Sequence, residues 1–203
     1  MEDHIARTRE TYDKVASPFL RNTRDRSVIR EWLDRFAGLL PAHARVLDVG
    51  SGPGFDSSEM RTRGLRPISV DLSLGMLRAG LREFPGPRVQ ADVRSLPFPS
   101  ASMAGVWANA CLLHLSQPET SSALEEIGRV LRPAGLLHVS VKLGSGAEWE
   151  SDRYGQPRWF QYWSASELDA ALASAGFRVQ SSWVNETNRA TWLIRFASLE
   201  RRA

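Results

Sequence analysis

The sequence predicts an α/β protein, in which a doubly wound, mostly parallel sheet of seven strands carries helices on both faces and ends in an antiparallel hairpin. Two observations lead to this fold. Short segments rich in β-branched and aliphatic residues alternate with longer amphipathic segments along the 203 residues, as expected for strands connected by helices. The last two apolar segments, 177–184 and 190–197, are only five residues apart, and so short a loop requires a hairpin.

The expected elements follow one another in regular order. Glycines at 64, 135 and 176 follow helical segments and are typical helix terminators, and Ser164 and Glu167 are typical of a helix start. The strands are expected at 45–49, 67–70, 88–91, 103–109, 135–141, 177–184 and 190–197. The helices are expected at 25–39, 56–63, 74–84, 118–131 and 166–175.

Composition indicates one globular domain in a reducing compartment. Hydrophobic residues make up 42% and charged residues 24%, which is ordinary globular usage. The sequence has no apolar run long enough for a signal peptide or a membrane span, and its single cysteine, Cys111, excludes an internal disulfide. We therefore expect a cytoplasmic protein. The net charge of +3 is small, and the arginines 21, 24, 26, 30 and 35 spread over more than one helix face, so nucleic acid is not expected as a partner.

Residues 45–54 (RVLDVGSGPG) join a short apolar strand to glycines at alternate positions, Gly50, Gly52 and Gly54. Glycine permits a sharp turn with positive φ and lets a ligand lie against the main chain. The dinucleotide fingerprint would need a glycine at position 55, where this chain has Phe55. The turn therefore indicates a nucleoside ligand without a pyrophosphate, although a tight strand-to-helix turn can use glycine for structural reasons alone.

Each of the first three strands ends in an aspartate, Asp48, Asp71 or Asp92. Ligands of such sheets bind outside the carboxyl ends of the strands, where these side chains meet. A carboxylate at the second strand can accept both ribose hydroxyls, one after the third strand can accept from an adenine amine, and one near the first turn can attract an ammonium group. Taken singly, each aspartate could instead cap a helix or a turn.

Together these segments resemble the small class I S-adenosylmethionine-dependent methyltransferases of the ubiquinone and menaquinone biosynthesis type, which have a Rossmann-like fold. The resemblance covers about residues 44–178 and is carried by 46–54 (VLDVGSGPG), 70–73 (VDLS) with 76–77 (ML), 91–98 (ADVRSLPF), 112–115 (LLHL) and 126–135 (EIGRVLRPAG). It implies S-adenosylmethionine as cofactor and S-adenosylhomocysteine as product. The cofactor-binding residues that it implies are Asp48, Gly50, Ser51, Gly52, Gly54, Asp71, Leu72, Ser73, Asp92, Val93 and Asn109.

Within that set, the resemblance implies that Asp48, Gly50 and Gly52 border the methionine portion, and that Asp71 binds the ribose. Leu72 would pack against adenine, Asp92 and Val93 would hold the adenine amine, and the segment 109–111 would lie beside the sulfonium. The sequence 109–112 (NACL) departs from the Asn-Pro-Pro-Tyr pattern, which argues against methylation of an adenine or glutamine amino group. The spacing of His, Glu and Asp suits no metal site, so no metal is expected.

Methyl transfer is an in-line displacement that needs alignment of donor and acceptor more than a base. His114, soon after the fourth strand, is the residue best placed to act as a general base, unless it only packs at a helix start. A small-molecule acceptor is expected to contact the N-terminal segment and the aromatic insertion, whose rings could equally pack on the sheet. The expected acceptor-binding residues are Tyr12, Phe19, Arg21, Arg158, Trp159 and Tyr162.

We divide the single domain 1–203 into a helical lid or extension (1–40), a cofactor-binding core (41–143), an aromatic insertion (144–164) and a C-terminal helix and hairpin (165–203). The leading hypothesis is a methyltransferase that acts on a small molecule as a monomer or homodimer. Two alternatives are a noncatalytic module that binds S-adenosylmethionine and an NAD(P)-dependent oxidoreductase, the latter disfavoured by Phe55 and Asp92.

Overall fold

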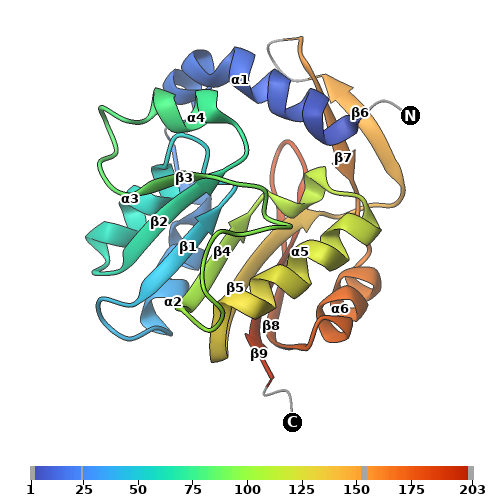
Figure 1. The fold of residues 1–203 in the computed structure, drawn as a ribbon. Helices are drawn as coiled ribbons and strands as arrows, with labels where there is room; N and C mark the ends of the chain where they lie inside the picture. The colour runs from blue at the N-terminus through green and yellow to red at the C-terminus, as the bar shows by residue number, and fades with distance from the viewer. Residues whose placement is uncertain (1–2, 24, 152–154, 201–203) are drawn as a thin grey trace.

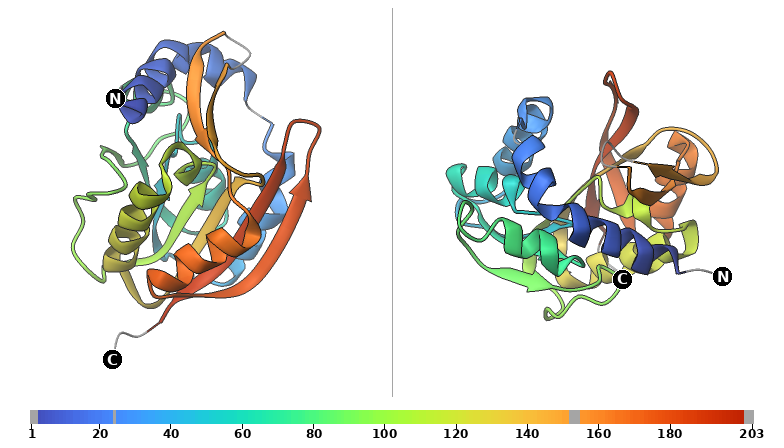
Figure 2. Two further views of the ribbon diagram at one scale, coloured as in Figure 1. Left: turned by 90° about the vertical axis from the view of Figure 1, so that its right-hand side faces the viewer. Right: turned by 90° about the horizontal axis from the view of Figure 1, so that it is seen from above.

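A computed structural model describes residues 3–23, 25–151 and 155–200, and it confirms the predicted fold class (Figure 1). Seven strands form one sheet in the order β3-β2-β1-β4-β5-β9-β8. The pairs among β1 to β5 are parallel, whereas β9 is antiparallel to both β5 and β8. A second sheet of two antiparallel strands, β6 and β7, lies above the carboxyl ends of the parallel strands, next to helix α1 (Figures 1 and 2).

The helical segments are α1 (His4–Asn22), the 3-10 turn η1 (Ser27–Ile29), α2 (Arg30–Gly38), α3 (Phe55–Thr62), α4 (Leu74–Ala79), the 3-10 turn η2 (Leu112–His114), α5 (Gln117–Val130) and α6 (Ala165–Ser174). The strands of the main sheet are β1 (Arg45–Val49), β2 (Arg66–Asp71), β3 (Arg88–Gln90), β4 (Met103–Asn109), β5 (Leu131–Lys142), β8 (Phe177–Glu186) and β9 (Thr191–Leu199). The strands of the small sheet are β6 (Ala147–Ser151) and β7 (Pro157–Gln161).

Both faces of the main sheet are covered by helices, as the sequence predicts. Successive side chains of a strand point to opposite faces, and β1 shows this alternation. Val46 packs in one core with residues of α2 and α3, whereas Leu47 and Val49 pack in a larger core with residues of α5 and α6. Because every side chain of β1 after Arg45 is buried, this strand fixes the position of the glycine turn that follows it.

Two expected helices are shorter in the structure. The helix expected over 74–84 ends at Ala79, and the chain continues in turns in which the Gly80 carbonyl oxygen accepts from the Phe84 N–H (2.9 Å) and from Arg88. The helix expected over 25–39 is divided into η1 and α2. There, the Asp25 carboxylate accepts from the Ser27 backbone N–H (2.9 Å) and favours a turn.

The aromatic insertion contains the β6–β7 hairpin, whose strands are not among the seven expected ones. Trp149 of β6 faces Trp159 of β7 in the register, and Glu148 faces Phe160. Residues 152–154 of the insertion lie outside the described residues. No helix of the described ranges is long and apolar enough to cross a membrane.

Helix α1 spans the molecule from α4 to β7 and is held on both sides (Figure 2). At α4, the Asp13 carboxylate accepts from the Ser73 hydroxyl (2.6 Å) and the Gly75 backbone N–H (2.7 Å). At β7, the Thr11 hydroxyl donates to the Pro157 carbonyl oxygen (2.7 Å). This helix therefore closes the space between the carboxyl ends of the strands and the hairpin.

Candidate functional site

A cavity of about 670 Å³ lies beneath α1, at the carboxyl ends of β1, β2 and β4. The end near the glycine turn is called the donor end here and is lined by Phe19, Thr23, Arg26, Val49, Gly50, Ser51, Gly52, Pro53, Phe55, Asp56, Val70, Asp71, Leu72, Ser73, Met76, Ala91, Asp92, Val93, Asn109, Ala110, Cys111 and Leu113. The acceptor end lies under α1 and β7 and is lined by Ile5, Thr8, Arg9, Tyr12, His114, Leu115, Lys142, Glu150, Arg158, Phe160, Arg189, Ala190 and Trp192.

The glycine turn exposes its main chain to the cavity, and its glycines have positive φ. Gly50 has a φ of +69°, and a Cβ placed there would lie 2.6 Å from the side chain of Cys111. Gly52 has a φ of +54°, and its backbone N–H donates to Asp71 Oδ2 (2.7 Å). Gly54, with a φ of +99°, precedes α3 and does not line the cavity. The turn is thus a cradle whose open surface is the backbone of Gly50 and Gly52.

Asp71 is held in place by two backbone amides. Its Oδ2 accepts from Gly52 and its Oδ1 accepts from the Ser73 N–H (2.8 Å). Burial raises the pKa of Asp71 to about 6, against the effect of these two hydrogen bonds, which lower it. Each oxygen retains a free lone pair for a hydroxyl donor, and Leu72 lies beside it on the cavity wall.

Asp92 and Val93 line the same end of the cavity after β3. The Arg94 guanidinium donates to both oxygens of Asp92, at 3.0 Å from Nε to Oδ1 and 2.6 Å from Nη2 to Oδ2. Burial opposes ionisation of Asp92, but the hydrogen bonds from Arg94 outweigh it and lower the pKa. Asp92 is therefore a fixed carboxylate acceptor.

Asp48 does not line the cavity, although it was expected among the ligand-binding acids. Its side chain is buried below the turn, where it accepts from the Ser57 hydroxyl (2.6 Å). Burial, followed by the charge of Asp56, raises its pKa to about 8. Like Val46, Asp48 points to the face of the sheet covered by α3, which explains its position.

The acid of this region that does line the cavity is Asp56, in the first turn of α3. Its carboxylate forms an ion pair with Arg26 and accepts from Trp107 Nε1 (2.9 Å) and Asn109 Nδ2 (3.2 Å). Neither Asp56 nor Arg26 was among the expected residues. An acid directly after the glycine turn was visible in the sequence, whereas nothing in the sequence relates Arg26 to it.

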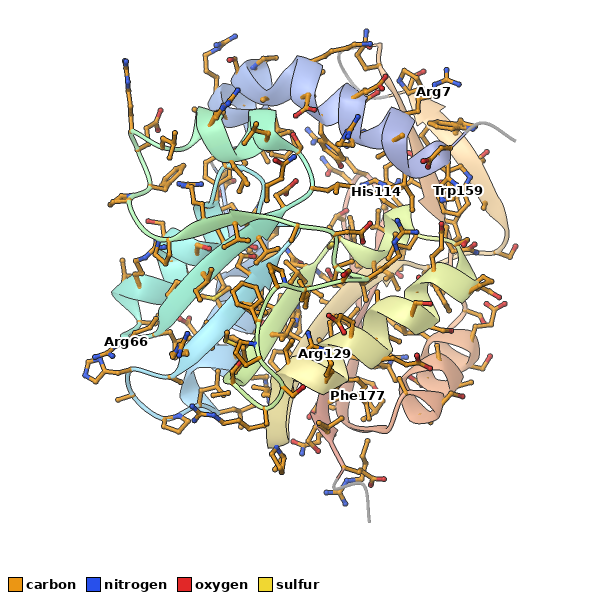
Figure 3. The ribbon with its side chains drawn as sticks, in the orientation of Figure 1. Arg7, Arg66, His114, Arg129, Trp159 and Phe177 are labelled. Atoms are coloured by element: carbon orange, nitrogen blue, oxygen red, sulfur yellow. The ribbon has the colours of Figure 1, made fainter. Side chains whose placement is uncertain are left out.

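At the acceptor end, His114 and Tyr12 form a hydrogen-bonded pair. His114 Nδ1 lies 2.7 Å from the carbonyl oxygen of Trp159, and because a carbonyl only accepts, Nδ1 carries the proton. The Nε2 atom therefore accepts from the Tyr12 hydroxyl, at 2.8 Å. Arg158 Nη1 donates to the same Tyr12 oxygen (3.2 Å). Figure 3 shows His114 beneath α1, with Trp159 on the neighbouring hairpin.

Burial and nearby cations keep His114 neutral. Burial lowers its pKa to about 3, and the charges of Arg158 and Lys142 act in the same direction. Burial also raises the pKa of the Tyr12 hydroxyl, although Arg158 opposes this effect. The pair can pass a proton from Tyr12 to Nε2, but it is a weak base.

The remaining expected acceptor-binding residues divide into two groups. Phe19 and Arg158 line the cavity, whereas Arg21, Trp159 and Tyr162 do not. Arg21 is exposed at the end of α1. The Trp159 ring packs on His4, with ring centroids 4.2 Å apart, and Tyr162 donates to Glu150. Among the aromatic rings of the insertion, that of Phe160 lines the cavity, whereas those of Trp159 and Tyr162 lie outside its lining.

Lys142, at the end of β5, adds a second cation beside Arg158. Its ammonium lies 2.5 Å from Glu150 Oε1 and 3.8 Å from the centroid of the Phe160 ring. Within residues 3–23, 25–151 and 155–200, no group of three or more His, Cys, Asp or Glu residues could hold a metal ion.

Comparison with known proteins relates this geometry to a family. Residues 47–139 match the model of the methyltransferase domain. The chain is 35% identical over 152 residues to a malonyl-[acyl-carrier protein] O-methyltransferase of Laribacter hongkongensis, covering 65% of this chain and 49% of that protein. It is 36% identical over 104 residues to a demethylmenaquinone methyltransferase of Renibacterium salmoninarum, covering 51% and 43%. The chain thus spans about half the length of these relatives.

A solved structure shares the fold. The 1,6-didemethyltoxoflavin-N1-methyltransferase of Burkholderia thailandensis, solved with S-adenosylhomocysteine bound, superposes with a TM-score of 0.79 at 23% identity and covers 97% of this chain and 88% of that chain. The comparisons support neither the oxidoreductase nor the noncatalytic alternative. The matched domain, the relatives and the common fold show that residues 47–139 form a methyltransferase domain similar to those of S-adenosylmethionine-dependent methyltransferases.

Proposed function

We propose that this chain transfers a methyl group from S-adenosylmethionine to an acidic small molecule. The observation that carries the proposal is one continuous cavity, with the glycine turn and two fixed carboxylates at one end and the Tyr12–His114 pair at the other. Such an arrangement holds a donor and an acceptor in line and keeps water out, which is what methyl transfer requires.

The donor end fits the cofactor. The backbone cradle at Gly50 and Gly52 accommodates a ligand that touches the main chain, which the substitution of either glycine would block. Asp71, fixed by two amides, has the remaining lone pairs to accept from ribose hydroxyls, and Asp92 can accept from the adenine amine. Leu72 would pack on the adenine. When bound, S-adenosylmethionine supplies a methyl group activated by the positive sulfur.

The Tyr12–His114 pair supports a modified form of the general-base hypothesis. His114 Nε2 is occupied by the Tyr12 hydroxyl, so the acceptor meets Tyr12 and not the imidazole. An acceptor proton would pass to Tyr12 Oη while the Tyr12 proton moves to Nε2, and the Trp159 carbonyl and Arg158 keep both groups oriented. In this form His114 acts through Tyr12.

The weakness of this pair as a base indicates how acidic the acceptor group is. Because the pKa of His114 is about 3, the pair can deprotonate only a group that ionises easily. Arg158 and Lys142 line the same end of the cavity, and their charges favour the anionic form of an acceptor. We therefore infer an acceptor with an acidic hydroxyl, an acidic carbon or a carboxylate. The different acceptors in the names of the two relatives leave its identity to experiment.

Three further predictions from the sequence belong to this proposal. The segment 1–40 would act as the lid and 144–164 as part of the acceptor site, since α1 and β7 both border the acceptor end. A cytoplasmic location and a monomeric or homodimeric state remain predictions, to be checked by cell fractionation and by sedimentation. A nucleic-acid acceptor is not proposed.

Isothermal titration tests the donor half of the proposal. S-adenosylmethionine and S-adenosylhomocysteine should both bind, and Asp71→Ala and Gly52→Val should weaken both. Asp34→Ala and Gly38→Val are matched controls, because both residues are exposed on α2 and a Cβ at Gly38 meets nothing within 4 Å. Absence of any binding by the wild-type chain would overturn the proposed function.

Transfer from a labelled methyl donor tests the acceptor half. The wild-type chain should label a metabolite of an extract, and purified acceptors should react faster when they carry an acidic group than when that group is esterified or amidated. Binding of the cofactor without any labelled product across such acceptors would favour the noncatalytic alternative.

A further inference from the structure

The donor end of the cavity contains several buried polar atoms that make no hydrogen bond within the described chain. Three of the residues concerned line the cavity beside the glycine turn, namely Thr23 (Oγ1), Arg26 (Nε) and Ser51 (Oγ). A buried polar atom without a partner costs free energy. Three such atoms at one end of a cavity indicate that a polar ligand completes their hydrogen bonding.

The charges at this end are paired and fixed in orientation. Arg26 and Asp56 form an ion pair, with side chains 23% and 8% exposed. Trp107 Nε1 and Asn109 Nδ2 both donate to Asp56 Oδ2, so Oδ1 is the atom left for Arg26 and a ligand. The two side chains come from segments on opposite sides of the turn, the linker after α1 and the first turn of α3.

The charge pattern selects a zwitterionic group. A ligand with only an anion at this position would meet the Asp56 carboxylate, and one with only a cation would meet the Arg26 guanidinium. An α-amino-acid group carries both charges on one carbon, so its carboxylate can accept from Arg26 while its ammonium donates to Asp56. The hydroxyls of Ser51 and Thr23 add two neutral donors for the carboxylate.

Asp48 cannot take this role. It lies below the turn, accepts from Ser57 and does not line the cavity. Its burial beside Asp56 favours its protonated form, because two carboxylates in one buried region repel each other.

We propose that Arg26 and Asp56 bind the α-amino-acid end of the cofactor, with Ser51 and Thr23 as further donors to its carboxylate. This inference rests on the proposed function, because it names the residues that would hold one end of S-adenosylmethionine. The proposal also explains why the linker after α1 reaches into the cavity. The linker contacts the ligand, and α1 closes over the same ligand.

Titration with two ligands tests the inference. S-adenosylhomocysteine carries the amino-acid group, whereas 5′-methylthioadenosine has the same adenosine and thioether without it. Arg26→Gln and Asp56→Asn should each raise the Kd of S-adenosylhomocysteine about tenfold or more, as expected for hydrogen bonds to charged groups. The Kd of 5′-methylthioadenosine should change by less than about twofold, because that ligand does not reach the pair. Arg30→Gln, an exposed arginine at the start of α2, is the matched control.

The outcomes separate the two proposals. If neither ligand binds the wild-type chain, the proposed function fails and the inference fails with it. If the wild-type chain binds S-adenosylhomocysteine and the variants bind it equally well, only the inference is overturned. Equal losses for both ligands would also overturn it, since they would indicate a general change of the cavity. Ser51→Ala removes one hydroxyl without removing a charge and serves as a second variant if Asp56→Asn does not fold. It should weaken the binding of S-adenosylhomocysteine and leave that of 5′-methylthioadenosine unchanged.

Discussion

His138 gives a prediction whose size follows from the structure. It lies at the centre of β5, is 1% exposed, and stacks on Trp107 with ring centroids 3.7 Å apart. Neither ring nitrogen has a hydrogen-bond partner among the residues that the structure describes. Burial alone lowers its pKa from 6.5 to about 3, so the folded chain holds this ring neutral in mildly acidic solution.

The sign of the pH dependence follows from linkage. Below pH 6.5 the unfolded chain binds a proton at His138 and the folded chain does not, so stability is full above the unfolded pKa and falls as the pH drops toward 3. The loss from this one group between pH 7 and pH 5 is about 2 kcal/mol. His138→Phe removes this pH-dependent loss. From pH 7 to pH 5, the free energy of unfolding of the variant should therefore rise by about 2 kcal/mol relative to that of the wild-type chain.

Urea unfolding, followed by circular dichroism at pH 7, 6 and 5, measures this difference. In the difference between the free energies of unfolding of the two chains at each pH, the contributions of the other titrating groups cancel. A constant difference caused by the altered packing does not change how this difference depends on pH. His43→Asn is the control, because His43 is exposed and has a φ of +60°, which asparagine tolerates. A difference between wild type and His138→Phe that stays constant from pH 7 to pH 5 would refute the reasoning.

Three other changes probe the site. Gly75→Val should release α1 from α4, because a Cβ there would lie 2.8 Å from Asp13 Oδ1 and 2.9 Å from Asp13 Cα; limited proteolysis should cut α1 faster, and unchanged protection would contradict the expectation. We expect the wild-type chain to lose affinity for S-adenosylhomocysteine below pH 6, where the buried Asp71 carboxylate, with a pKa of about 6, gains a proton. Asp71→Asn should not show this loss, and titrations of both chains at pH 5 and pH 7 compare their affinities. Tyr12→Phe should lower kcat roughly 100-fold with little change in cofactor Kd, and rates equal to wild type would exclude Tyr12 from proton transfer.

The sequence predicted the main sheet well because its strands carry clear signals. Segments 45–49 and 103–109 are apolar, are followed by polar or glycine-rich turns, and have the predicted bounds in the structure. Asp71 ends β2, and Asp92 follows β3, at the same edge of the sheet. Both residues line the cavity, as that topology requires. Period-2 alternation along β1 could also have shown that Asp48 points with Val46 to the face under α3.

Other parts of the site depend on contacts that no local pattern reveals. His114 is oriented by a backbone carbonyl 45 residues away, at Trp159, and a carbonyl has no sequence signature. The ion pair of Arg26 and Asp56 joins two segments through the fold alone. The aromatic residues of the insertion suggested a binding pocket, but aromatic rings are equally common where they only pack against other side chains. Trp159 is such a ring, because it packs on His4.

The attachment of α1 on two sides, through Asp13 at α4 and Thr11 at the hairpin, has a consequence for the timing of turnover. A bound nucleoside under such a helix can leave only after at least one attachment breaks, so opening of α1 should set the rate of product exchange. On the hairpin side, the Thr8 hydroxyl also accepts from the Trp159 N–H (3.1 Å), and the Tyr12 hydroxyl accepts from Arg158 (3.2 Å). All these contacts lie within residues 8–13 of α1, so one local opening of this segment should expose the donor end and the acceptor end together.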